Sequence, residues 1–320
     1  MVRAPLWSVM IPTYRPRRDL LERAIGSVLP QSPSRSDMQI EIVDDGSKDA
    51  AWLDDLPSQY LNRVEVYRSS ENTGIGDAWN RCISRARGSL VHILHQDDQV
   101  LPGFYCRLEE GMRRYPHAAA AVCRYAIADE LGNWLTIAHL ESPTPRLLDD
   151  ATTAIAMRDL VQCAGIVVRR STYGALGGFH KGLTHALDIE MWVRIAASSP
   201  IYYDPEILAI WTRHESATTS QQIRLGENTL DIAKAITIWR KHLPEPRSSR
   251  LAKAVGRRHS QVALSLGEYL LRENHRGGAM RHLQAALACH NHPQTLFSVA
   301  IILIRAMLRK MRPRRGPVSN

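Results

Sequence analysis

The chain has 320 residues, of which 44% are hydrophobic, and a formal net charge of +9 at pH 7. This composition excludes collagen-like, disordered and disulfide-stapled proteins, and the length suits one large α/β domain with a smaller appendage. The basic charge favours anionic partners such as nucleotide phosphates, nucleic acid or membranes, without choosing among them. The five cysteines lack zinc-ligand or redox spacing, which indicates a reduced cytosolic setting.

Short apolar runs alternate with amphipathic segments along the first half of the chain. The expected elements, in chain order, are a strand at 7–11, a helix at 20–28, strands at 40–43 and 64–67, a helix at 75–86, a strand at 90–94 and a helix at 103–115. This alternation predicts an α/β fold with a mostly parallel sheet flanked by helices. Ligands of such sheets bind beyond the carboxyl ends of the strands.

The second half of the chain changes character. Strands are expected at 119–125, 162–168 and 207–212, a helix at 188–197, and longer helices at 222–242, 251–273, 277–288 and 294–311. We therefore predict two domains, an α/β domain at 1–215 and an α-helical C-terminal region at 216–320.

Neither a secretory signal nor a membrane span is expected, because the first apolar run ends at Pro12 and the apolar run at 297–304 is too short. A cytoplasmic protein follows. Residues 296–308 are nonetheless strongly apolar, and basic residues lie in and after them: Arg305, Arg309, Lys310, Arg312, Arg314 and Arg315. Two interpretations stay open: peripheral binding to the anionic inner face of the cytoplasmic membrane, or a packed helix with a solvated basic tail.

Two adjacent carboxylates, Asp97 and Asp98, follow the strand expected at 90–94. Adjacent acids repel each other, but they become useful when a divalent cation lies between them and a diphosphate. Mg²⁺ or Mn²⁺ prefers such oxygen ligands and neutralises charge on a departing diphosphate. The alternative is that one of the two acids only caps the following helix.

Other polar residues also fall at expected strand or helix ends. Asp45 follows the second strand, where it could bind a uracil imide or a ribose hydroxyl, or serve only an Asp-Gly turn. Asn72 and Gly74 precede a helix, where glycine permits close approach to an anion; an ordinary loop is the alternative. Arg169 and Arg170 could contact donor phosphates or lie in solvent.

Asp188 opens the helix expected at 188–197. A carboxylate near an acceptor hydroxyl can take its proton as the oxygen attacks. The alternative is a first-turn acid that only balances the helix dipole. His185 and His214 are further polar candidates, although an isolated histidine is more often structural.

Taken together in this order, the clusters resemble glycosyltransferase family 2, which has the GT-A fold, over roughly residues 7–215. The similar segments are SVMIPTY at 8–14, IVDDGS at 42–47, NTG at 72–74 with AWN at 78–80, LHQDD at 94–98, LGGF at 176–179 and LDIEMWVR at 187–194. Two positions depart from the family pattern. His95 replaces the first Asp of the family's Asp-x-Asp metal motif, and Leu187 replaces the Glu of its Glu-Asp motif.

The resemblance implies a role for each cluster. Asp188 is the implied catalytic base, Asp97 the implied ligand of a divalent cation (Mn²⁺ or Mg²⁺), and Asp98 a residue that supports that site or touches the donor sugar. The remaining donor-binding residues implied are Pro12, Thr13, Tyr14, Asp45, Asn72 and Gly74. The C-terminal third is not covered by the resemblance.

The implied reaction is an inverting single displacement from a nucleotide-diphosphate sugar to a saccharide or lipid-linked acceptor. Family members act in surface polysaccharide, lipopolysaccharide and glycolipid synthesis, so a hexosyl- or deoxyhexosyl-type transferase is expected. The main alternative is a non-catalytic nucleotide-sugar-binding module, which the departures at His95 and Leu187 motivate. A nucleotidyltransferase would need a glycine-rich basic loop after the first strand, and nucleic-acid binding would need a reader motif; neither is present in the sequence.

Overall fold

The structure is a computed structural model, and it describes residues 4–32, 34, 36–158, 160–214 and 223–311, with side chains described as far as Leu308. The chain divides into two compact units, residues 1–214 and 215–320. Of the basic cluster expected near the C-terminus, Arg312, Arg314 and Arg315 lie outside the described residues, as do the side chains of Arg309 and Lys310.

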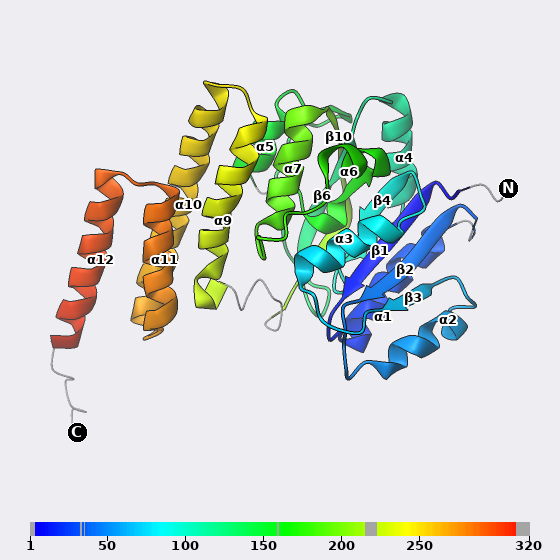
Figure 1. Ribbon diagram of the computed structural model, residues 1–320, viewed down its shortest axis with the longest axis horizontal. Helices are drawn as coiled ribbons and strands as arrows, with labels where there is room; N and C mark the ends of the chain where they lie inside the picture. Colours follow the sequence, from blue (N-terminus) through cyan, green and yellow to red (C-terminus); the bar gives the residue numbers. More distant parts are fainter. Residues whose placement is uncertain (1–3, 33, 35, 159, 215–222, 312–320) are drawn as a thin grey trace. The chain divides into compact units, whose positions relative to one another are not determined.

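Four parallel strands form one half of the sheet in the first unit (Figure 1). In sheet order they are β3 (Glu65–Arg68), β2 (Met38–Asp44), β1 (Trp7–Thr13) and β4 (Leu90–Ile93). Every residue of β1, β2 and β4 is buried. Strands covered on both faces read as continuous apolar runs, which explains why the sequence pattern located them.

The other half of the sheet is mixed. β9 (Ile166–Arg169) runs antiparallel to both β4 and β6 (Ala120–Asp129), and β6 pairs in parallel with β10 (Ile201–Arg213). Three short antiparallel strands complete the sheet: β5 (Gln99–Val100), β7 (Trp134–Ile137) and β8 (Arg146–Leu147). The α/β class is thus confirmed. The uninterrupted parallel part of the sheet is the half formed by β3, β2, β1 and β4.

Helices flank this sheet. They are α1 (Arg18–Val28), α2 (Leu56–Gln59), α3 (Ile75–Arg85), α4 (Phe104–Arg114), α5 (Ala151–Met157), α6 (Arg170–Leu176) and α7 (Leu187–Ser198), with short 3-10 turns η1 (Leu29–Gln31), η2 (Ala51–Asp55) and η3 (Cys163–Gly165). α1 buries the apolar stripe from Leu20 to Val28 that predicted it.

Two strand predictions differ from the structure. The strand expected at 162–168 is partly wrong, because η3 occupies Cys163–Gly165 and β9 begins only at Ile166. A short apolar run does not distinguish a buried turn from a strand. β10 begins at Ile201, earlier than the expected start at 207. Its register with β6 is interrupted after Asp204, so the sequence pattern indicated only the part of the strand that follows this irregularity.

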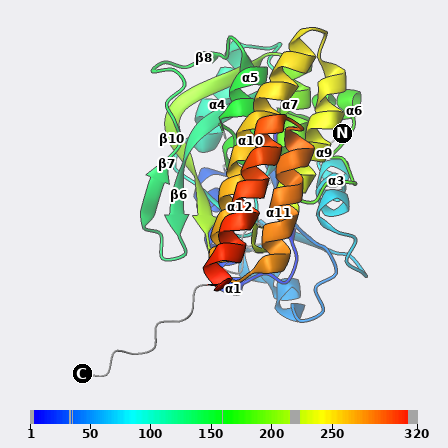
Figure 2. The ribbon, with the colours of Figure 1, turned by 90° about the vertical axis from the view of Figure 1, so that its left-hand side faces the viewer.

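The second unit is helical, as expected. It contains α9 (Glu227–Trp239), η4 (Arg240–His242), α10 (Arg247–Arg272), α11 (Arg276–Cys289) and α12 (Pro293–Met311), and α12 packs against α10 and α11 (Figure 2). The single helix expected at 222–242 is wrong, because Gly226 takes a φ of +73° and α9 starts after it. Among the described helices, none combines the length and apolar character needed to cross a bilayer.

Candidate active site

The turns after β1, β2 and β4 meet at one edge of the sheet. The backbone N–H of Asp45, just past β2, donates to the carbonyl of Thr13 at 2.9 Å. The N–H of Tyr14 donates to the side chain of Gln96, in the turn after β4, at 3.0 Å. Parallel strands end at the same edge, so three predicted clusters come together there. Pro12 is buried with Thr13, whereas the Tyr14 side chain is 42% exposed.

Asp45 fastens the loop that precedes α3. Its carboxylate accepts hydrogen bonds from the Thr73 N–H (3.0 Å), the Thr73 hydroxyl (2.7 Å), the Gly74 N–H (2.9 Å) and Arg81 (3.0 Å). The Asn72 amide donates to the Asp45 carbonyl at 3.2 Å. A carboxylate has about four acceptor positions, so these donors use its capacity. The base contact expected of Asp45 therefore stays a prediction, and the structure adds a positioning role.

Gly46, in the turn after β2, allows the backbone of Glu71 and Asn72 to pass close to that turn. Its φ is +77°, and a Cβ atom there would lie 2.4 Å from the Glu71 carbonyl carbon and 2.6 Å from the Asn72 nitrogen. Asp44 closes the same turn by accepting from the Ser47 N–H at 3.0 Å. Only glycine combines the positive φ with this close approach of backbone.

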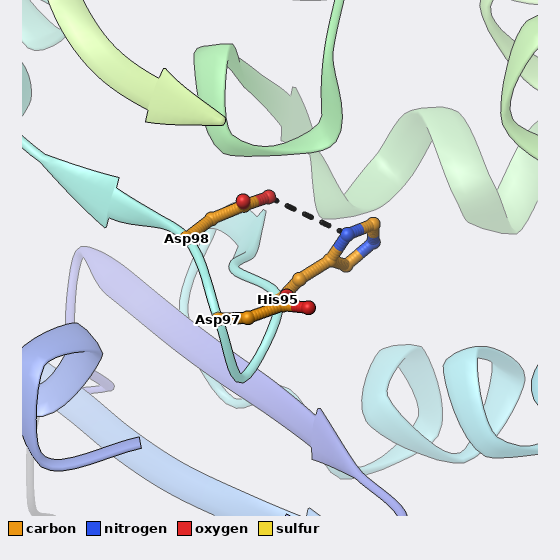
Figure 3. A group of neighbouring side chains, drawn as sticks. All are labelled: His95, Asp97 and Asp98. Atoms are coloured by element: carbon orange, nitrogen blue, oxygen red, sulfur yellow. Dashed lines mark ion pairs between the residues drawn. The ribbon is translucent and has the colours of Figure 1, made fainter. Parts of the chain in front are cut away.

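His95, Asp97 and Asp98 form a cluster in the turn after β4 (Figure 3). One potential ligand atom from each residue lies within 4.8 Å of the others. Asp98 accepts from the Thr212 N–H at 2.9 Å and lies 3.5 Å from His95 Nδ1, and Asp97 Oδ2 lies 2.8 Å from Nε2 of His214. His95 Nε2 is buried without a hydrogen-bond partner among the described residues.

The electrostatics of this cluster fit a cation site. Burial raises the pKa of Asp98 well above its ordinary value, and the neighbouring Asp97 raises it further. Burial lowers the pKa of His95, while Asp97 and Asp188 oppose that shift. Two carboxylates that repel each other, beside a neutral imidazole with an unpartnered nitrogen, are a donor set for a divalent cation.

Asp188 lies in the first turn of α7 and is partly buried. Burial raises the pKa of its carboxyl, while His185, the Ile189 amide and His95 act in the opposite direction. Burial raises the pKa of the Cys163 thiol, and Asp188 and Asp98 both raise it further. Asp188 thus acts electrostatically on His95 and shares Cys163 as a neighbour with Asp98, so the expected base and the acidic cluster are close in space.

Residues 8–185 match the family model of Glycosyl transferase family 2. The chain belongs to glycosyltransferase family 2. An uncharacterised protein of Mycobacterium tuberculosis is 25% identical over 263 residues, covering 78% of this chain and 81% of its own length. An uncharacterised glycosyltransferase of Rickettsia typhi is 24% identical over 218 residues, covering 68% of this chain and 67% of its own length.

The fold of this family 2 glycosyltransferase is that of a solved relative. S. aureus TarS 1–349, in a structure with UDP-GlcNAc, superposes with a TM-score of 0.68 at 16% identity, covering 97% of this chain and 93% of TarS 1–349. At this identity the likeness concerns the fold, and it confirms the expected GT-A architecture.

Two side chains position α7 in the glycosyltransferase. Asn80 of α3 accepts from the Phe179 N–H at 2.7 Å and donates to the Phe179 carbonyl at 2.9 Å. Arg194 of α7 pairs with buried Glu190 at 2.7 Å and donates to the Leu176 carbonyl, also at 2.7 Å. The AWN and LGGF segments are therefore locked together just before the helix that carries the expected base.

One contact could not be predicted from the sequence, and for Arg169 and Arg170 the structure argues against the first of two open alternatives, contact with donor phosphates. His214, treated as an isolated histidine, follows β10 and reaches Asp97 from 117 residues away. Arg169 and Arg170 do not reach the candidate site, because antiparallel β9 pairs Arg169 with Leu90 at the opposite edge of the sheet. Arg170 there lines a cavity of about 940 Å³ together with Trp7, and none of the residues that the family resemblance implies for the site lines it.

Replacing Gly46 with alanine tests the crossing of the two loops. We expect Gly46→Ala to lower the free energy of unfolding by about 2–4 kcal/mol, because it combines a left-handed backbone with overpacking. Urea unfolding measures this change. The control is Gly26→Ala at an exposed position of α1, where a Cβ meets nothing within 4 Å and should stabilise by up to about 1 kcal/mol. Equal effects of the two substitutions would contradict the conclusion that the loop crossing requires glycine at position 46.

Proposed function

We propose that the chain is an inverting glycosyltransferase that moves a hexosyl or deoxyhexosyl unit from a nucleotide-diphosphate sugar to an acceptor hydroxyl. One arrangement carries this proposal: the turn after β4 brings His95, Asp97 and Asp98 together, and Asp188 of α7 is near enough to raise the pKa of the His95 imidazole. A general base and a group that binds the leaving diphosphate must face a single anomeric carbon from two sides, and this proximity supports that arrangement.

Asp188 is the proposed general base. It takes the proton of the acceptor hydroxyl while that oxygen forms a bond to the anomeric carbon, and the bond from that carbon to the diphosphate oxygen breaks. Attack opposite the leaving group inverts the configuration. The raised pKa of Asp188 makes its carboxylate a stronger base than an exposed aspartate.

Asp97 is the proposed principal ligand of a divalent cation, with His214 beside it. His95 and Asp98 complete the donor set, and Thr212 fixes Asp98. A bound Mn²⁺ or Mg²⁺ would supply positive charge to the departing diphosphate. Replacement of the family's first acid by His95 exchanges an oxygen ligand for a nitrogen ligand, which favours Mn²⁺ over Mg²⁺.

The donor site is proposed at the edge formed by the turns after β1 and β2. Exposed Tyr14 and Asn72 are available to contact a nucleotide, while Pro12, Thr13, Asp45 and Gly74 shape the surface beneath it. The solved structures of TarS with UDP-GlcNAc and with UDP support a nucleotide-sugar donor.

A role in surface polysaccharide synthesis, with a saccharide or lipid-linked acceptor, is part of the proposal. It is supported by a putative teichuronic acid biosynthesis glycosyltransferase of Bacillus subtilis, TuaG, which is 39% identical over 98 residues, 30% of this chain and 37% of its own length. We propose a cytoplasmic protein that meets its acceptor at the inner face of the membrane. Exposed Phe297 and Met307 on α12 leave the C-terminal helix a candidate for that contact.

A non-catalytic binding module is the competing function, and Leu187 favours it. This residue replaces the family's Glu and is only 1% exposed, so it belongs to the core and brings no charge to the site. Sugar transfer or donor hydrolysis distinguishes the two functions, because the binding module would bind a nucleotide sugar without turnover.

The donor and cation can be tested together by thermal shift. A nucleotide sugar with Mn²⁺ at 100 times its dissociation constant should stabilise the protein by about 2.7 kcal/mol, because it binds only the folded state. Asp97→Asn should lose the Mn²⁺-dependent part of the shift. The control Asp149→Asn, at a side chain 81% exposed, should retain it. Identical shifts with and without Mn²⁺ in the unmodified protein would argue against the cation site.

Asp188→Asn separates the catalytic role from helix capping. We expect kcat to fall roughly 10²–10⁴-fold, the usual contribution of a general base. The melting temperature should hold or rise, because the substitution removes a charge that burial disfavours. A capping role predicts the opposite pattern, with normal turnover and lower stability. Glu227→Gln, at the first-turn acid of α9, is the matched control and should leave kcat unchanged.

The pH dependence of kcat is a further test of Asp188. Burial raises the pKa of the Asp188 carboxyl above the ordinary value of about 3.9. The active carboxylate form is therefore lost at a higher pH than for an exposed aspartate. We expect kcat to fall with decreasing pH through that raised pKa. Steady-state rates at saturating donor and acceptor measure the profile. An acid limb at the ordinary carboxyl pKa would exclude Asp188 as the base.

A further inference from the structure

The hairpin formed by β6 and β7 exposes an unusual amount of apolar surface. In the described part of the first unit, eight large hydrophobic side chains are exposed, and five of them fall within the ten residues 131–140. Their exposed fractions are 83% for Leu131, 49% for Trp134, 55% for Leu135, 48% for Ile137 and 44% for Leu140. Exposed apolar side chains grouped in this way indicate a binding surface.

The hairpin is an ordered element. Asp129 accepts hydrogen bonds at 2.9 Å from the N–H groups of Leu131 and Asn133, and Gly132 turns the chain with a φ of +91°. An ion pair between Glu130 and Arg17 ties the tip to the turn that follows β1. The exposed side chains are therefore presented by a preorganised turn, which lowers the entropic cost of binding.

The geometry of β7 limits what can cover it. β7 lies beside β6 at the margin of the sheet (Figure 2). Successive side chains of a strand point to opposite faces, and all four residues of β7 are exposed, so both faces present apolar groups. Edge pairing with a second copy of this chain would cover neither face, and a sugar ring would stack on one side of Trp134. The interfacial layer of a bilayer surrounds an inserted hairpin on both faces, and it favours tryptophan beside aliphatic side chains.

The tip of the hairpin carries no charge, because residues 131–140 contain no Asp, Glu, Lys or Arg. Three acids flank it: Glu130 pairs with Arg17, Glu141 pairs with Arg158, and Asp129 accepts hydrogen bonds from the N–H groups of Leu131 and Asn133. On the basic side, the Arg124 guanidinium donates to the Ala138 carbonyl, and exposed Arg213 lies opposite Asp129 in the β6–β10 register. The flanking acids are thus held by partners within the protein, and Arg124 and Arg213 carry positive charge beside the apolar tip, which suits anionic lipid head groups.

We propose that the 129–141 hairpin docks the protein onto an anionic lipid bilayer, with Leu131, Trp134 and Leu135 in the interfacial layer. β6 runs parallel to β4, because β9 is antiparallel to both, so the hairpin leaves the sheet at the edge that carries Asp97. This deepens the proposed function and rests on it in one respect: the acceptor is lipid-linked and is presented at that edge.

Vesicle flotation of the full-length protein tests the docking without donor or acceptor. The protein should float with phosphatidylcholine vesicles that contain phosphatidylglycerol and bind pure phosphatidylcholine more weakly. The double variant Trp134→Gln, Leu135→Gln should bind about tenfold or more weakly, since two apolar anchors are lost. The control Leu61→Gln removes a side chain that is 85% exposed elsewhere and should bind normally. Melting temperatures check that both variants fold.

A second measurement follows the tip itself. A solvatochromic dye on Leu131→Cys, in a Cys106→Ser background that removes an exposed thiol, should shift to the blue with anionic vesicles, while the same dye on Leu61→Cys should not. Unchanged flotation of the double variant would overturn the proposal and assign binding to α12. Failure of the unmodified protein to float, or a dimer that the double variant abolishes, would overturn it as well. The Asp188→Asn variant should float normally. Failure of the proposed catalytic role and failure of the docking proposal are therefore distinguishable.

Discussion

The candidate site depends on a few partly buried polar contacts that join segments distant in sequence. Asp45 fixes the loop before α3, Asn80 of α3 grips the backbone of Phe179, and Arg194 holds the same segment from α7, where Asp188 lies. Each contact satisfies a backbone group that would otherwise be left without a partner in a dry environment. The position of the proposed base relative to the donor edge is therefore set by these hydrogen bonds together with the packing of α7, most of whose apolar residues are buried.

The site also concentrates groups that oppose folding. Burial raises the pKa of both Asp98 and Asp188, and Asp97 adds like charge next to Asp98. His95 Nε2 and the Thr212 hydroxyl are buried without partners among the described residues. Buried polar atoms without partners, and buried carboxyl groups with raised pKa values, destabilise an ordinary protein core. Such groups cluster at binding sites, where a ligand supplies the missing contacts. The surrounding apolar core of β1, β2 and β4 supplies the stability that offsets them.

Much of the fold could be predicted because β1, β2 and β4 are continuous apolar runs, and because α1, α3 and α4 have a strong helical periodicity. The remainder depended on tertiary context. β7 is exposed on both faces, so no alternation marks it, and Gly226 breaks a helix only because the chain turns there. For the site, adjacent motifs such as Asp97-Asp98 were visible in the sequence. His214 was not, because its pairing with Asp97 spans 117 residues, and Arg169 misled because strand direction cannot be read from an apolar run.

His214 is the last residue of the first compact unit, and the second begins at Glu215. The C-terminal limit of the proposed catalytic site therefore coincides with the junction between the two units. Natural recombination or deliberate fusion that exchanges the helical extension must break the chain after this histidine. A graft made even one residue earlier would leave Asp97 facing whatever side chain the new module contributes.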